Sequence, residues 1–475
     1  MNKYLQYIIF FSLFIIAGLF FGRWLFHDPT NSFVLSKPGM DNVGIDAVER
    51  IKVNIGEFFE KFRNSNTPGN GENWPRFRGA CFDNISKANI KLINKFPEKG
   101  PEIIWQHQLG EGHAGAAIFD GLVYILDYDE EKRADMLRCF TLAGGIENWR
   151  RWYKNNLKRN HGLSRTVPAV TQDYIVSIGP RCHVMCVERK TGNFLWGIDI
   201  EKEYGSEIPL WYTGQCPLID NGVAIIATGG KSLMIGVDCK TGKILWETPN
   251  PNNWKMSHAS IMPFEFEEEK IFVYPAIGGI CGIGANEKNI GKVLWETTEW
   301  DHNVVAPSAV CMPDGKIFLT AGYGAGSMIL QLSKSDGNYQ VRVLDEYKPV
   351  NGLACEQQTP VFWQGHLFGV LPKDAGHRRN QFVCVNPNNC REIVSESGKV
   401  HRFGLGPYLF ADGKFWLLKD DGTLVIIEAS TRKYKQLDEF KLLNGHDAWA
   451  PLALADGYLV LRDSKTLMCV DIREK

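Results

Sequence analysis

KTGNFLW (Lys190–Trp196) is followed fifty residues later by KTGKILW (Lys240–Trp246). The shared pattern is a Gly followed four residues later by a Trp, and it occurs again at Gly145–Trp149 and Gly291–Trp295. Successive tryptophans of this pattern are 47, 50 and 49 residues apart, and an earlier Trp105 lies 44 residues before the first of them. A period in the forties is typical of propellers and solenoids, in which each repeat is one supersecondary unit.

A second signal recurs in each period: a short apolar strand, a turn and a β-rich strand. Three of these turns are Asp-Gly pairs, at Asp314, Asp412 and Asp456, and Asp-Gly between apolar runs is a hairpin signature. Helical periodicity is nearly absent after residue 75. We therefore predict an all-β fold over residues 75–475, an eight-bladed β-propeller with four-stranded blades. The eight hairpins are expected to begin near Gly115, Thr166, Gln215, Ala259, Ala306, Thr359, Gly406 and Ala450.

The repeat also predicts how the ring closes and how its blades pack. The last blade is one strand short, and the unpaired strand Pro101–Leu109 is expected to complete it, which removes an exposed edge. In each repeat the Gly is expected in the turn between the last two strands, where its freedom at positive φ is useful. Asp238 is expected to cap one such turn. The tryptophans are interpreted as structural docking residues that pack between blades, namely Trp105, Trp149, Trp196, Trp246 and Trp295.

The N-terminus carries a candidate membrane segment. Tyr4–Gly22 is nineteen residues without a charge, close to the roughly 20 needed to cross a bilayer. No small-residue cleavage pattern ends this run, so residues 1–26 are predicted to be an uncleaved transmembrane signal anchor, with a cleaved signal peptide as the alternative. The expected localisation is a single-pass membrane protein with its propeller on the periplasmic, extracytoplasmic side.

Residues 27–74 are predicted to link the anchor to the propeller. Apolar residues in Asp41–Asn64 recur at steps of three and four, which indicates an amphipathic stalk helix. Asn64–Asn73 is rich in Asn, Gly, Pro and Ser, which indicates a flexible linker. We expect this helix to pack on the propeller or to lie on the membrane. The alternative is that it docks a partner protein.

Composition excludes one class of partner. The formal net charge is -1 and no long basic run occurs, so a nucleic-acid partner is not expected. The 12 cysteines fall mostly inside apolar strand patterns and are expected to behave as buried hydrophobes. Cys384 and Cys390 could pair across a hairpin in an oxidising compartment. Cys182 and Cys186 are about 13 Å apart along a strand, which is too far for a bridge.

Candidate ligand-binding residues lie just before the predicted inner strands, where loops open onto the central funnel. A ring that mixes His, Arg, Trp, Gln and carboxylate side chains could hold a polar planar ligand or an anion. The alternative is that these side chains are the ordinary polar lining of a water-filled channel. Glu356, Asp447 and Asn303 could in principle surround Ca²⁺, although no metal ligand and no catalytic residue is assigned. The candidates are His161, Arg165, Trp211, Gln215, His258, Asn303, Glu356, Gln357, Gln358, Tyr408, His446, Asp447 and Trp449.

The repeats VDCKTGKILW and VERKTGNFLW resemble the tryptophan-docking repeats of pyrroloquinoline-quinone (PQQ) dehydrogenase-like eight-bladed propellers. NWPRFRG (Asn73–Gly79) is similar to the lead-in of a bacterial envelope branch of these proteins. The superfamily includes quinoprotein dehydrogenases, in which the resemblance implies a vicinal cysteine disulfide, a Trp, Ca²⁺ and a catalytic Asp around PQQ. It also includes the non-catalytic propeller of the outer-membrane protein assembly machinery.

This chain has no Cys-Cys pair and no C-x-x-C-H haem motif. The expectation is therefore a protein-binding or assembly scaffold for envelope or membrane proteins, without catalytic activity and without a cofactor. The alternative is a PQQ- and calcium-dependent quinoprotein oxidoreductase that uses the central funnel.

Overall fold

The computed structural model describes residues 3–26, 53–63, 65, 69 and 71–475. The chain divides into two compact units, residues 1–49 and 50–475. In the first unit, helix α1 (Lys3–Phe26) has a mean hydropathy of 2.2 over its most apolar window and is long enough to cross a membrane. The predicted apolar helix is thus confirmed; an anchor and a signal sequence share these properties.

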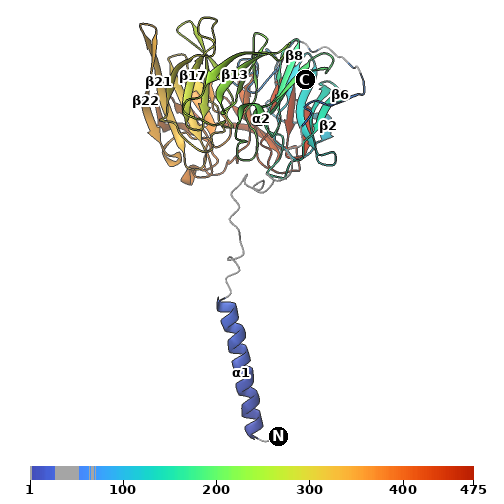
Figure 1. Cartoon of the computed structure of the whole chain (residues 1–475), viewed down its shortest axis with the longest axis vertical. Helices are drawn as coiled ribbons and strands as arrows, with labels where there is room; N and C mark the ends of the chain where they lie inside the picture. The colour runs from blue at the N-terminus through green and yellow to red at the C-terminus, as the bar shows by residue number, and fades with distance from the viewer. Residues whose placement is uncertain (1–2, 27–52, 64, 66–68, 70) are drawn as a thin grey trace. The chain divides into compact units, whose positions relative to one another are not determined.

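In the second unit, the described strands form eight antiparallel sheets, which confirms the predicted eight-bladed propeller (Figure 1). We number the blades in chain order, from the innermost strand outward. Blades 1 to 4 are β3–β6 (Ala117–Phe119, Leu122–Asp129, Ala134–Thr141, Glu147–Lys154), β7–β10 (Ala169–Val170, Tyr174–Ile178, His183–Glu188, Phe194–Asp199), β11–β14 (Leu218–Asp220, Val223–Ala227, Ser232–Asp238, Ile244–Pro249) and β15–β18 (Met262–Phe266, Glu269–Ala276, Gly279–Gly284, Val293–Thr297).

The remaining blades follow the same order of strands. Blades 5 to 8 are β19–β22 (Val310–Cys311, Lys316–Ala321, Gly326–Ser335, Asn338–Tyr347), β23–β26 (Val361–Trp363, His366–Val370, Phe382–Asn386, Asn389–Glu396), β27–β30 (Tyr408–Ala411, Lys414–Leu418, Thr423–Glu428, Gln436–Lys441) and β31–β33 (Ala453–Ala455, Tyr458–Arg462, Thr466–Asp471) with β2 (Glu102–Gln108). Short helices α2 (Ile200–Tyr204), η3 (Pro349–Asn351) and η4 (Gly376–Arg378) lie in connections.

The ring closes as the sequence predicts. Strand β2 pairs antiparallel with β33, so a segment near residue 105 completes the blade built from the C-terminus. In the register of this pair, Trp105 lies opposite Cys469. The join leaves the last blade with the same four strands as the others and removes an edge that another chain could pair with.

The Thr-Gly turns and the docking tryptophans form one repeated contact between blades. Asp238 caps its turn as predicted, because its Oδ1 accepts from the backbone N of Thr241 at 2.7 Å. Trp196 of blade 2 packs on Gly242, which is in the equivalent turn of blade 3. A Cβ added at Gly145, Gly192, Gly242 or Gly291 would lie 2.5–2.9 Å from the ring of the Trp of the preceding blade. The Gly is therefore required both for its left-handed backbone and for the space it leaves.

Small side chains lie opposite each docking Trp within its own blade. The residue paired with Trp149 is Cys139, and the residue paired with Trp196 is Cys186. Trp246 and Trp295 face glycines in the equivalent register. Several of the buried cysteines thus have a packing role, because a thiol fits under an indole where a larger side chain would not.

The predicted stalk helix is wrong where the structure describes it. Residues Phe58–Lys61 form strand β1, which pairs antiparallel with β6 and adds a fifth strand to blade 1. Phe58 stacks on Trp152 with ring centroids 4.1 Å apart. The open edge of β6 supplies a ladder of backbone partners, and this long-range pairing prevails over the local apolar spacing. Residues 41–52 of the predicted helix lie outside the described residues.

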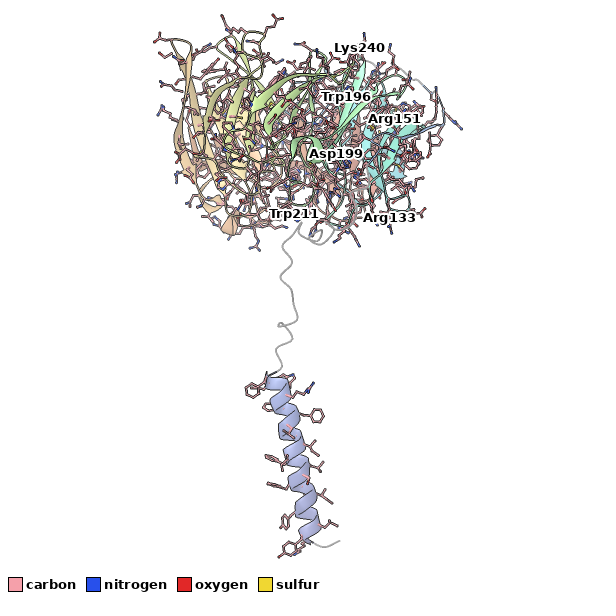
Figure 2. The ribbon with its side chains drawn as sticks, viewed as in Figure 1. Arg133, Arg151, Trp196, Asp199, Trp211 and Lys240 are labelled. Atoms are coloured by element: carbon pink, nitrogen blue, oxygen red, sulfur yellow. The ribbon has the colours of Figure 1, made fainter. Side chains whose placement is uncertain are left out.

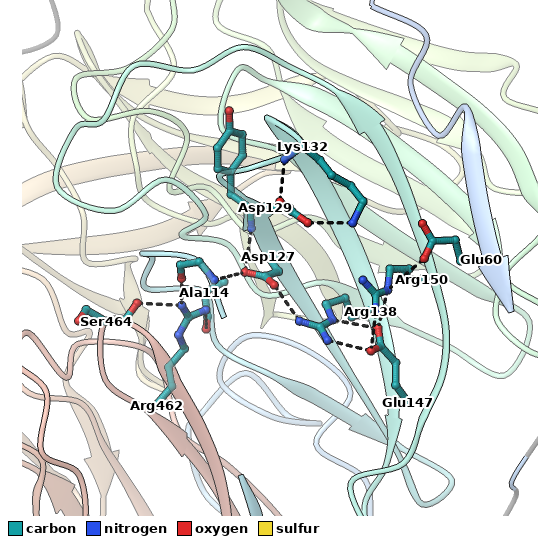
Figure 3. A network of polar contacts seen from close by, with 12 residues as sticks. Glu60, Ala114, Asp127, Asp129, Lys132, Arg138, Glu147, Arg150, Arg462 and Ser464 are labelled. Atoms are coloured by element: carbon teal, nitrogen blue, oxygen red, sulfur yellow. Dashed lines mark hydrogen bonds and ion pairs between the residues drawn. The ribbon is translucent and has the colours of Figure 1, made fainter. Parts of the chain in front are cut away.

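A chain of ion pairs joins β1 to the seam where the ring closes (Figure 3). Glu147 accepts bidentate hydrogen bonds from both Arg138 and Arg150, at 2.8–3.0 Å. Arg138 also reaches Asp127 at 2.9 Å, while Arg150 approaches Glu60 of β1 at 3.8 Å. The Asp127 carboxylate accepts from the backbone of residue 110, beside the buried Arg462 of blade 8. The network fixes the first blade to β1 at its outer edge and to blade 8 across the seam.

A segment that the repeat analysis did not predict crosses the central channel. The Pro75 carbonyl accepts from Val170 of blade 2, and the Arg78 guanidinium donates to the two carbonyls of Thr359–Pro360, which precede blade 6. Blades 2 and 6 are diametrically opposite in an eight-bladed ring, so residues 75–78 pass through its axis. We call residues 72–92 the floor segment.

The floor segment lies at one defined end of the channel. It bonds to the turns that directly follow inner strands: Asn73 to Asp120, and Leu92 to Asp412, at 2.8 and 2.9 Å. Since the candidate funnel residues precede the inner strands, they lie at the opposite end. The floor segment therefore covers the end of the channel that lies opposite those loops.

Candidate functional site

The sequence-predicted funnel residues occupy the connections that lead into the inner strands. Figure 2 shows Trp211, which precedes β11, at the opposite end of the propeller from Lys240, which is in a Thr-Gly turn. Contacts in these connections, and in hairpin turns at the same end, link all eight blades. We call this set of loops the funnel ring.

Arg165 holds two connections of the funnel ring together. Its Nε donates to the carbonyl of Trp211 at 2.6 Å, and its Nη2 donates to the carbonyl of His161 at 2.6 Å. Burial lowers the pKa of Arg165 to about 10, opposed by the nearby Tyr323 and Tyr212 hydroxyls. The guanidinium stays charged at neutral pH, and it acts chiefly as a brace for the backbone that carries Trp211.

An aromatic stack lies beside this brace. The rings of Trp211 and Tyr323 are stacked with centroids 5.7 Å apart and an interplanar angle of 21°, and His258 is 6.3 Å from Trp211 on another connection. Tyr323 is 62% exposed. Both aromatic residues have left-handed backbone angles, φ 61° and 58°. Bulky residues in this region are strained, and such strain is concentrated at functional sites.

A second group of contacts lies on the other side of the funnel ring. Trp449 donates from Nε1 to the Asp420 carboxylate at 2.8 Å, and its carbonyl accepts from Gln358 at 3.1 Å. The ring of His113 lies 5.1 Å from that of Trp449, and the Nε2 of His113 is 3.1 Å from the carbonyl of His161. These contacts connect the loops before blades 6, 8, 1 and 2.

Some predicted funnel residues have other roles. Gln215 is fully buried and bonds through its amide to both backbone atoms of Ala227, so it fixes the inner edge of its own blade. Tyr408 is also buried, and its hydroxyl bonds to the carbonyl of Thr359. Asn303 is exposed and takes no part in the contacts above. The His446 side chain is exposed, and its Nδ1 lies 2.9 Å from the Asp447 carboxylate.

Sequence reasoning missed three members of the funnel ring: His113, Tyr323 and Asp420. His113 precedes an inner strand, like the candidates that were named, so position in the repeat could have found it. Tyr323 lies in the turn between β20 and β21, within the stretch AGYGAGS. A bulky aromatic residue between two glycines in a hairpin turn is the signal that could have identified Tyr323. Asp420 carries no comparable signal.

Burial sets the protonation of the funnel ring. Burial, and then the charge of Arg165, lower the pKa of both His113 and His258 to about 3, so both imidazoles are neutral at pH 7. Burial also raises the pKa of Glu356 and of Asp420 above the usual carboxyl range. The ring therefore combines neutral imidazoles, aromatic faces and partly desolvated carboxyls.

The alternative hypothesis requires calcium and PQQ in the funnel. Within the described residues, no group of three or more His, Cys, Asp or Glu side chains is placed to hold a metal ion. Glu356 packs against Gly322 of the blade 5 hairpin, whereas Asp447 bonds to His446. The sequence also lacks the vicinal cysteines expected beside the quinone.

Comparisons with known proteins support the propeller fold. A family model described as outer membrane protein assembly factor BamB matches residues 93–324. A solved europium-containing methanol dehydrogenase superposes with a TM-score of 0.57 at 12% identity, over 83% of this chain and 90% of that one. The computationally designed Ika8 protein gives a TM-score of 0.52 at 13% identity, over 78% and 100%. No curated protein matches the chain.

The likeness to an enzyme and to a designed protein at similar scores shows the fold alone. The tryptophan-docking contacts, the closure of blade 8 by β2 and the matched family model support a PQQ-like β-propeller family for this chain.

Proposed function

We propose that this chain is a single-pass, membrane-anchored, extracytoplasmic β-propeller that acts as a protein-binding or assembly scaffold and has no catalytic activity. Its partners are envelope or membrane proteins. The apolar helix α1 supports the anchor, and the match to an outer membrane protein assembly factor supports both the compartment and the kind of partner.

The observation that carries the proposal is the strained aromatic pair Trp211 and Tyr323 on the open side of the funnel. Trp, Tyr and Arg dominate the binding energy of protein interfaces, and here an Arg braces the backbone of the Trp. Rigid display reduces the conformational entropy lost on binding. The floor segment blocks the other end of the channel, so a partner reaches the aromatic pair from the side of the funnel ring.

A site-specific cross-link in native membranes tests the proposal. A photoreactive phenylalanine analogue replaces Tyr323 in the full chain, and the same analogue replaces Leu245 as the control, because Leu245 is an exposed apolar residue on the outer strand β14. We expect a protein adduct of defined mass from position 323 and none from position 245.

The Trp211→Ala change should reduce the yield of the adduct from position 323 at least tenfold, since Tyr323 loses its stacking partner. Identical adducts from both positions, or an adduct at position 323 that does not depend on Trp211, would contradict the proposal. Circular dichroism spectra and thermal unfolding of each variant confirm that the propeller is intact.

A further inference from the structure

Two buried cysteines from adjacent blades meet beneath Trp196. Cys186 lies on β9 of blade 2, directly opposite Trp196 in the sheet register. Cys239 follows β13 of blade 3 and begins the Thr-Gly turn of that blade. The Sγ of Cys186 is 3.4 Å from the carbonyl oxygen of Cys239, and the same oxygen accepts from the Nε1 of Trp196 at 2.9 Å. Both thiols are fully buried in one apolar cluster.

The repeat explains why two cysteines meet at the junction between blades 2 and 3. A thiol opposite a docking Trp approaches the residue three positions before the Gly of the next blade. At the seam between blades 8 and 1, the Sγ of Cys469 approaches the carbonyl of Leu142 at 3.9 Å. At the junction of blades 2 and 3, the residue in the place of Leu142 is itself a cysteine, Cys239. The fold thus brings two thiols together across a blade junction.

The thiols also interact with each other. The neighbouring Cys239 thiol, followed by burial, raises the pKa of Cys186 well above its usual value. A buried thiol of this kind is a poor nucleophile in the closed structure. Oxidation therefore takes place while blades 2 and 3 assemble or when they open, rather than on the closed propeller.

We propose that Cys186 and Cys239 form a redox-dependent disulfide that staples blade 2 to blade 3. Each thiol gives up one proton, and together they give up two electrons as the bond between the two sulfurs forms. A disulfide oxidant, such as oxidised glutathione or a dithiol oxidoreductase in its disulfide form, accepts the two electrons and the two protons and is reduced to two thiols. The bond closes a loop that contains β10, α2, β11, β12 and β13.

The staple constrains two blades that carry part of the funnel ring. Trp211 lies within the closed loop, in the connection between the joined blades. Cross-linking the two blades reduces the freedom of the unfolded chain between them, and therefore stabilises the folded ring. The inference does not depend on the proposed scaffold function, because it concerns the chemistry of two residues in the core.

Peptide mapping of the full chain in detergent tests the staple. The protein is unfolded and refolded in glutathione redox buffer, remaining thiols are alkylated, and trypsin digestion proceeds without reductant. We expect the peptide of residues 182–189 to be linked to that of residues 232–240. The first peptide also contains Cys182, so the digest is repeated with Cys182→Ala, which should leave the link in place.

A stability measurement accompanies the map. Refolding with oxidised rather than reduced glutathione should raise the thermal midpoint of the wild-type chain by roughly 3–6 °C. Cys239→Ala and Cys239→Ser should lose this difference. Cys139→Ala is the control and should keep it. Cys139 also lies opposite a docking Trp, but the residue in the place of Cys239 at its blade junction is Arg189, which cannot form a disulfide. Full alkylation of both cysteines after oxidative refolding, or a link from either to another cysteine, would overturn the proposal.

Discussion

Trp196 of blade 2 lies on Gly242 of blade 3, and its indole Nε1 donates to the carbonyl of Cys239 at 2.9 Å. Trp105 and its partner Leu142 show the same bond at 2.7 Å across the seam where the ring closes. The Gly and the Trp of one repeat therefore do not act on each other. Each of the tryptophans of blades 8, 1, 2 and 3 acts on the Gly of the following blade, so the motif encodes the junction between blades as well as the turn.

Replacing Gly242 by Ala tests this junction. Gly242 has φ +72° and a Cβ there would lie 2.7 Å from Trp196, whereas Gly222 has φ +78° and nothing within 4 Å. Gly222→Ala introduces backbone strain alone and should lower the free energy of unfolding by about 1 kcal/mol. Gly242→Ala adds a steric clash and should lower it by roughly 3 kcal/mol. Urea unfolding measures both, and equal losses would show that the Trp contact is unimportant.

The indole hydrogen bond can be separated from indole packing. Trp196 has a carbonyl partner, but the buried Nε1 of Trp295 has none among the described residues. Trp196→Phe leaves the carbonyl of Cys239 short of a donor, whereas Trp295→Phe removes an unsatisfied donor. We expect Trp196→Phe to lower the free energy of unfolding by about 1–2 kcal/mol more than Trp295→Phe does. The reverse order in urea unfolding would refute this explanation.

The repeated features were predictable because their signals are local and recur. A Gly four residues before a Trp specifies a turn and an outer strand in each repeat, and the missing last strand required a partner from the N-terminus. Strand β1 and the floor segment occur once each, and their partners are distant in sequence. Phe58 pairs with Trp152, and Arg78 bonds to Thr359, so no local pattern could reveal either contact.

The candidate site was predictable in place and less so in detail. Position before an inner strand selected Arg165 and Trp211, but it could not separate them from Gln215, whose side chain turns back to its own blade. Orientation depends on packing that a single sequence does not display. Tyr323 was missed because it lies between the second and third strands of its blade and does not precede an inner strand.

Asp135 provides a test by pH. It is 2% exposed on β5, accepts from Asn155 Nδ2 at 2.6 Å, and burial raises its pKa to about 7. Between about pH 4 and pH 7 the unfolded chain ionises this carboxyl while the folded chain keeps it protonated. The contribution of Asp135 to stability is therefore greatest at low pH and is lost as the pH rises to 7.

The Asp135→Asn variant isolates this effect, because the amide has the same shape and does not titrate. The free energy of unfolding of the variant, relative to wild type, should increase by on the order of 3 kcal/mol between pH 4.5 and pH 7.5. Denaturation at both pH values measures it. A relative stability that stays constant or decreases would show that Asp135 is ionised in the fold.

Arg78 tests whether the floor segment closes the channel. Its guanidinium donates to the carbonyls of Phe82, Thr359 and Pro360, at 2.8–3.1 Å. Arg78→Met leaves these three acceptors unsatisfied and should lower the free energy of unfolding by roughly 2–4 kcal/mol. Because the bonds cross the channel axis, amide hydrogen exchange should increase most in residues 74–86. Arg159→Met is the control, since Arg159 is 81% exposed and pairs only with Glu111. Exchange in residues 74–86 that is equal in the two variants would mean that Arg78 does not hold the segment across the ring.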